Sequence, residues 1–137
     1  MNYIEVKGGT KKERELVEAT IALCIRQLMP RTRSLDIEAK IVKNCSAYGY
    51  CCQTDNNRTF ELEIRKGLGL YDLIATVCHE MVHVKQYYRK ELTEDRIWKK
   101  RKIGSDVKYL DQPWEKEAFK LEEKLAVECF KKLTVTM

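Results

Sequence analysis

The stretch LYDLIATVCHEMVHVKQYYRKE, residues 70–91, contains both of the chain's histidines, His79 and His83, with Glu80 directly after the first. On a helix, side chains four positions apart lie one turn apart on the same face, so both imidazoles can point at one metal ion. Glu80 lies about 100° further round, where it reaches the open side of such an ion. This HExxH pattern therefore predicts a zinc-binding helix around which the rest of the chain is organised.

The same stretch has the hydrophobic periodicity of a helix with one buried face. At about 100° per residue, the apolar side chains fall on one arc, and the polar ones, including both histidines, fall opposite. The apolar arc is formed by Leu73, Ile74, Val77, Cys78, Met81, Val84 and Tyr88. The alternative is two ordinary histidines on a solvated face. Their spacing and the glutamate between them favour the metal site.

Length and composition restrict the class of protein. A chain of 137 residues predicts one domain, residues 1–137. A content of 44% hydrophobic and 34% charged residues is typical of a soluble globular protein. No apolar run approaches the roughly 20 residues that cross a bilayer, and residues 1–10 lack the apolar core of a signal peptide. We therefore expect a cytoplasmic protein with no membrane partner.

The six cysteines are expected to be reduced. The sequence has no CxxC pair and no export signal, so a disulfide framework is not indicated. Cys24, Cys78 and Cys129 fall within apolar helical patterns, where a free thiol acts as a small hydrophobic side chain. A structural zinc site rich in cysteine is the alternative.

The formal net charge is +5, and the densest basic run is Lys99–Lys102, directly after Trp98. A basic patch beside an aromatic ring can contact a nucleic-acid backbone. Four charges without a binding motif are more typical of a solvated loop or hairpin tip, which is the interpretation that we favour.

Patterning elsewhere predicts an α+β protein. A capping box of Thr10 and Glu13 opens the first helix, and Pro113 stands in the first turn of the last one. Between Glu91 and Gln112 we expect a hairpin or ordered loop that turns at Gly104, and residues 55–57 form a turn. The expected strands are residues 2–7, 35–43, 46–53, 59–65, 96–102 and 106–110, and the flanking helices are residues 10–29 and 113–133.

A catalytic zinc ion needs a third protein ligand. With both histidines used, a carboxylate or thiolate must supply it. On the last helix Glu115 falls inside the apolar arc, whereas Glu117 falls outside it and is expected to be exposed. A carboxylate on an apolar face needs a partner, and a metal ion is a strong candidate. The alternative is a glutamate at the rim whose carboxylate reaches water.

The motif HEMVH at residues 79–83, followed by Glu115-Lys116-Glu117-Ala118 on a later helix, resembles the glutamate zincins. Residues 58–125 are similar to small phage-encoded or bacterial metallopeptidases, related loosely to SprT-like and ImmA/IrrE-like proteins. The resemblance implies one zinc ion held by His79, His83 and Glu115. A third histidine of the SprT type is absent, and Phe119 stands where many such enzymes carry an acidic or amide residue.

The fold implied is a minimal zincin-like domain. Its N-terminal helix and a small, mostly antiparallel sheet pack on the HExxH helix, and its C-terminal helix supplies the third ligand. A phage-encoded chain of this kind would work in the host cytoplasm.

The activity implied is zinc-dependent hydrolysis of peptide bonds in a peptide or protein substrate. Zinc polarises a water molecule and Glu80 takes its proton as general base. Tyr87 and Tyr109 are candidate donors to the oxyanion. The strand at residues 59–65 is expected at the cleft edge, where it would pair with an extended peptide. Iron, manganese or cobalt would also suit this ligand set.

Two other functions compete with this one. The first is a non-catalytic binding or virion protein that keeps zinc as a structural tie, although such a site has no need of Glu80. The second is a protease that docks on nucleic acid through Lys99–Lys102 and acts on bound proteins.

Overall fold

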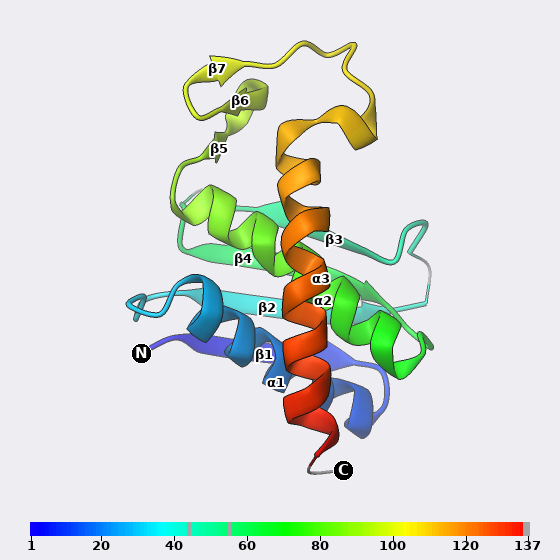
Figure 1. Ribbon diagram of the computed structural model, residues 1–137. Coiled ribbons are helices and arrows are strands. Elements are labelled where there is room, and N and C mark those ends of the chain that lie inside the picture. Colours follow the sequence, from blue (N-terminus) through cyan, green and yellow to red (C-terminus); the bar gives the residue numbers. More distant parts are fainter. Residues whose placement is uncertain (44, 55, 136–137) are drawn as a thin grey trace.

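The computed structural model describes residues 1–43, 45–54 and 56–135 and has the expected α+β composition (Figure 1). Two short 3-10 turns, Glu94–Arg96 and Tyr109–Asp111, lie between the second and third helices. The strands and helices are β1 (Tyr3–Gly8), α1 (Lys11–Leu28), β2 (Asp36–Val42), β3 (Gly49–Gln53), β4 (Thr59–Arg65), α2 (Leu70–Tyr88), β5 (Leu92–Thr93), β6 (Ile97–Trp98), β7 (Arg101–Lys102) and α3 (Pro113–Thr134).

The main sheet is mixed, with the strand order β1-β2-β4-β3. The expectation of a mostly antiparallel sheet is wrong, because β1 pairs with β2 and β2 with β4 in parallel, and β3 alone of the described strands in this sheet runs antiparallel to its neighbour. The physical reason is the connection through α1, which returns the chain to the end of the sheet from which β1 started. β3 then runs back along the far side of β4, at the sheet edge.

One face of the sheet carries the core, as predicted by the alternation of apolar and polar residues in the expected strands 35–43 and 59–65. The inward side chains of β2 and β4 are buried, and α1 and α2 cover them while α3 crosses in front of both helices (Figure 1). These inward side chains are Ile37, Ala39, Ile41, Phe60, Leu62 and Ile64. The helices that cover the sheet therefore also bring α2 and α3 into direct contact.

The helix starts follow local sequence rules. The Thr10 hydroxyl accepts a hydrogen bond from the Glu13 amide (3.1 Å), and the Glu13 carboxylate accepts one from the Thr10 amide (2.9 Å), which confirms the capping box. Pro113 occupies the first turn of α3, as predicted. Of the predicted turn at residues 55–57, Asp55 lies outside the described residues, and the Asn56 side chain accepts from the Arg58 amide (2.8 Å).

The segment between α2 and α3 differs from expectation. β5, β6 and β7 form a small antiparallel sheet whose last turn is at Lys99 and Lys100, not at Gly104. Both lysines have positive φ values (48° and 72°), a conformation that two-residue hairpin loops usually give to Asn or Gly. Residues 106–110 form no strand. The sequence gives no signal for this turn, because lysine rarely adopts such a backbone.

All six cysteines are free thiols, as predicted. No helix in the described part of the chain is both long and apolar enough to span a bilayer.

Candidate metal centre

The three predicted ligands lie together where α2 packs against α3. His79 Nε2 is 3.0 Å from one carboxylate oxygen of Glu115, and His83 Nε2 is 3.2 Å from the other. All three side chains are buried, and one donor atom from each lies within 4.8 Å of the others. The HExxH spacing sets the two imidazoles one turn apart, and the first turn of α3 brings the carboxylate to both. Two imidazole nitrogens and one carboxylate are a donor set that suits zinc.

A second ring of side chains holds both imidazoles. His79 Nδ1 is hydrogen-bonded to Glu122 (2.9 Å), and His83 Nδ1 to Gln86 Oε1 (2.8 Å). A carboxylate or amide oxygen accepts, so Nδ1 donates in each pair, and a metal ion that replaced the proton on Nε2 would find the lone pair of that nitrogen directed at the candidate centre. Sequence reasoning missed both residues. The available signal was helical spacing, because Gln86 follows His83 by three positions and Glu122 follows Glu115 by seven.

Gln86 connects the second ring to α3. Its buried side chain donates to the backbone oxygen of Trp114 (2.9 Å) and to Glu117 (3.1 Å). Glu117 also accepts from Lys85 (2.8 Å). The expectation that Glu117 is exposed is wrong, because Lys85 reaches across from α2 and half-buries the carboxylate between the two helices. This network fixes the position of α3, and therefore of Glu115, relative to the histidines.

The charges at the centre depend on each other. Burial acts to raise the pKa of Glu115, but hydrogen bonds from His79 and His83 outweigh it and lower that pKa to about 2. Burial acts to lower the pKa of His79, and hydrogen bonds to Glu115 and Glu122 raise it to about 9. Without these partners the buried carboxylate would be costly. Glu115 is thus held as an ionised ligand.

Glu80 faces the open side of the centre. It lines two cavities of about 250 and 380 Å³, of which the first also contacts His79 and the second contacts His83 and Glu115. The lining residues common to both cavities are Ala47, Gly49, Glu80 and Tyr109. Burial raises the pKa of Glu80 above its usual value. Glu80 therefore lies between two adjoining cavities, which together form a cleft beside the three candidate ligands.

The two tyrosines named from the sequence occupy different positions at this cleft. The Tyr109 hydroxyl donates to Glu115 (3.0 Å) and the residue lines both cavities. Tyr87 lines the larger cavity, and its ring lies 6.3 Å from that of Phe60. Burial raises the pKa of Tyr87 to about 12, so this side chain keeps its proton. The structure thus brings Tyr109 into contact with a candidate ligand and places Tyr87 in the cleft wall.

The strand at the cleft is β3, which corrects the expectation for residues 59–65. β4 lies between β2 and β3, so both of its edges are already paired. β3 and the residues before it line the cavities instead. Gly49 allows β3 to approach α2, since a Cβ atom there would lie 2.8 Å from Thr76 Cγ2 and 3.4 Å from Glu80 Cγ. Among the described strands, the outer edge of β3 is therefore unpaired and borders the candidate metal centre.

The chain has no significant match among protein-family models, curated proteins or solved structures.

Proposed function

We propose that this protein is a zinc-dependent metallopeptidase of the glutamate-zincin type. The observation that carries the proposal is the convergence of His79, His83 and Glu115 beside a cleft lined by Glu80. A zinc ion held by these three ligands would act as a Lewis acid and lower the pKa of a water molecule toward 7.

The roles of the protein groups follow from their positions. Glu80 takes a proton from the attacking water and delivers it to the leaving amine. The Tyr109 hydroxyl, next to Glu115, is the candidate donor to the developing oxyanion, and Tyr87 contributes to the cleft wall. Glu122 and Gln86 hold the imidazoles by their Nδ1 atoms, an orientation that would leave Nε2 for a bound ion.

The substrate that suits this cleft is an extended peptide. β3 is the terminal strand of the described sheet, and its outer edge can pair with a peptide backbone by strand addition. Both cavities are lined in part by this strand. Successive side chains of a paired peptide would point alternately into the cleft and into solvent. Main-chain pairing gives affinity for many sequences, whereas the two cavities would select among side chains.

The test is a comparison of wild type with Glu80→Gln on a peptide library, with new chain ends identified by mass spectrometry. Both proteins should bind one equivalent of zinc. Removal of a general base should lower the cleavage rate by about 100- to 10,000-fold. Glu61→Gln, an exposed carboxylate on β4, is the matched control and should cleave like wild type. Equal cleavage by wild type and Glu80→Gln would mean that Glu80 is not the general base. No cleavage by either protein would favour the non-catalytic zinc protein.

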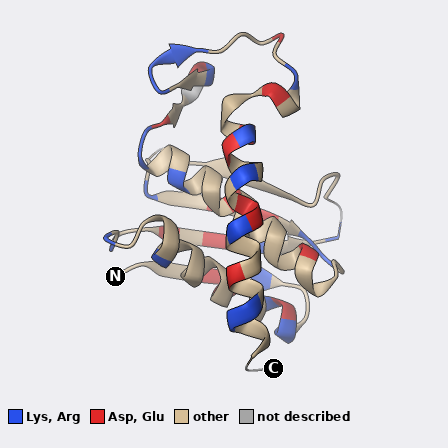
Figure 2. Cartoon of the chain, viewed as in Figure 1, with Lys and Arg blue, Asp and Glu red and all other residues tan. Residues whose placement is uncertain are grey.

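One surface supports a further role for such a protease. Lys99, Lys100, Arg101 and Lys102 are all exposed, and basic residues gather on this hairpin (Figure 2). We propose docking on nucleic acid through this hairpin as the second candidate. Retention on DNA should then weaken as salt rises and disappear when the four residues are changed to glutamine. Salt-independent or unchanged retention would reject docking without affecting the hydrolase proposal.

A further inference from the structure

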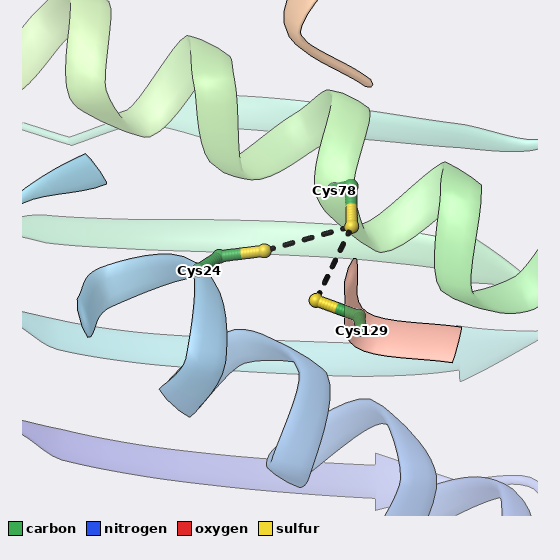
Figure 3. A group of neighbouring side chains, drawn as sticks. All are labelled: Cys24, Cys78 and Cys129. Carbon is green, nitrogen blue, oxygen red and sulfur yellow. Dashed lines mark hydrogen bonds between the residues drawn. The ribbon is translucent and has the colours of Figure 1, made fainter. Parts of the chain in front are cut away.

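Three cysteines meet in the core on a different face of α2. Cys24 comes from α1, Cys78 from α2 and Cys129 from α3, and all three are fully or almost fully buried. The Cys78 sulfur lies 3.7 Å from that of Cys24 and 3.9 Å from that of Cys129 (Figure 3). The three sulfurs all lie within 4.8 Å of one another. Residues far apart in sequence thus bring three soft donor atoms to one point.

The distances between the sulfurs are compatible with a bound metal ion, and not only with apolar packing. Cysteine in a core acts as a small hydrophobic side chain, and that role needs only apolar neighbours. Here each sulfur instead points at another sulfur (Figure 3). A metal–sulfur bond of about 2.3 Å requires sulfur–sulfur distances of roughly 3.8 Å in a tetrahedral site and 4.0 Å in a trigonal one. The sulfur–sulfur distances from Cys78 to Cys24 and to Cys129 lie close to these values, so an ion would need little movement of the helices.

We propose that Cys24, Cys78 and Cys129 form a three-coordinate site for Cu(I), a soft, thiophilic ion. Soft thiolates select Cu(I), zinc or iron–sulfur clusters. Structural zinc is almost always four-coordinate, and no fourth histidine, cysteine or carboxylate joins this group among the residues that the structure describes. The three cysteines lie within the apolar core, where a water molecule acting as fourth ligand would find few polar partners.

Binding at this site is ligand exchange without a redox step. Cu(I) enters as Cu(I), copper–sulfur bonds form, and each sulfur that binds as a thiolate releases its proton to solvent. The ion would tie α1 and α3 to α2 at the residue directly before His79. Occupancy would therefore restrain the rotation of the helix that carries both imidazoles. This inference is independent of hydrolysis, because it concerns sulfur ligands on the other side of α2.

The experiment uses the full chain, reduced and metal-free, titrated anaerobically with Cu(I) buffered by a competing chelator. X-ray absorption at one equivalent should show three sulfur neighbours at about 2.3 Å. Cys24→Ala and Cys129→Ala should each weaken binding by more than about 100-fold, since loss of a second-ring residue alone costs up to that amount. Cys45→Ala, a buried cysteine outside the cluster, is the matched control and should bind like wild type.

Melting curves of the metal-free variants show whether each one folds. If an alanine variant does not fold, the sulfur count of the wild type still decides. Fewer than three sulfur neighbours, a shell of nitrogen and oxygen only, or unchanged affinity in Cys24→Ala would overturn the proposal. Tight binding of zinc with a fourth ligand would overturn the three-coordinate assignment. Absence of any Cu(I) binding would leave the cluster as core packing.

Discussion

The two donor clusters on α2 begin at neighbouring residues, Cys78 and His79, and both are buried, but they differ in their surroundings. His79, His83 and Glu115 border a cleft, and each polar atom of theirs has a partner. Cys24, Cys78 and Cys129 lie inside the apolar core. A buried imidazole or carboxylate needs hydrogen bonds, whereas a thiol needs almost none. The polar cluster therefore depends on a second ring of side chains that the sulfur cluster can do without.

This difference makes the polar cluster more sensitive than the sulfur cluster to substitution of neighbouring residues. Gln86 serves His83, Trp114 and Glu117 at once, so one substitution disturbs a ligand and the contact between two helices. In the sulfur cluster Cys78 on α2 contacts Cys24 on α1 and Cys129 on α3 directly (Figure 3). We expect substitutions around the histidines to spread along the network and those around the cysteines to stay local.

The largest expected effect tests whether the two clusters are separate. Glu115→Ala removes one of three candidate ligands and should weaken zinc binding at the histidines by more than about 100-fold. Cu(I) binding at the cysteines should not change. Competition with a chromophoric chelator measures both affinities. Glu123→Ala, exposed on the same helix, is the control. A Glu115→Ala protein that binds zinc as tightly as wild type would mean that another group serves as third ligand.

A smaller effect tests the second ring. Gln86→Leu keeps the volume of a buried side chain but removes the acceptor for His83 Nδ1 and the donor to Trp114. Zinc affinity should fall by about 10- to 100-fold. The same chelator competition measures this change. Gln27→Leu, exposed on α1, should leave zinc affinity unaltered. Equal affinities for both variants would show that Gln86 only packs between the helices.

These network residues mark the limit of what the sequence predicts. The HExxH spacing predicts that α2 carries two of the candidate ligands, and the position of Glu115 on an apolar arc predicts the third. Both are properties of a single helix. Gln86 and Glu122 act across the contact between α2 and α3, so their partners depend on how the helices cross. The expectation that Glu117 is exposed is wrong for the same reason, since Lys85 reaches its carboxylate from the other helix.

The strands show the same limit. Alternation predicted which side chains of β2 and β4 face the core, because it is local to each strand. Alternation carries no information on which strands pair. It therefore could not predict that β3, and not β4, lies at the cleft edge. The cysteine cluster is a further case. Each thiol lies on an apolar stripe of its own helix, and only the packing of three helices brings the sulfurs together.

The next prediction concerns the cleft side of α2. Gly49→Ala places a methyl group 2.8 Å from Thr76 Cγ2 and 3.0 Å from the Glu63 backbone oxygen. Overpacking of this kind should lower the free energy of unfolding by about 1 to 3 kcal/mol, and it should push β3 away from Glu80. Urea denaturation measures the loss. Gly69→Ala is the control, because no atom apart from its chain neighbours lies within 4 Å of its Cβ position. Gly69 is the N-cap residue of α2, so this change should cost less than about 1 kcal/mol. Equal losses would show that β3 does not press against α2.

The smallest effect lies far from both clusters and concerns the start of α1. Thr10→Ala should lower the free energy of unfolding by about 1 kcal/mol through loss of the cap. The affinities for zinc at the histidines and for Cu(I) at the cysteines should not change. The hydrogen bond from the Thr10 amide is the main cause that lowers the pKa of Glu13 below its ordinary value of 4.5, and the Gly67 amide adds to it.

A carboxylate whose pKa is lowered by folding stabilises the protein above the pKa of the unfolded chain and loses that contribution as pH falls. The stability difference between wild type and Glu13→Gln should therefore be constant at neutral pH and shrink as the pH drops below 4.5, as urea denaturation at several pH values would show. Glu18→Gln, an exposed carboxylate on the same helix, is the matched control. A difference between wild type and Glu13→Gln that persists undiminished in acid would mean that the ionised carboxylate is not what closes the cap. The amide of glutamine would then fail for its shape instead of its charge.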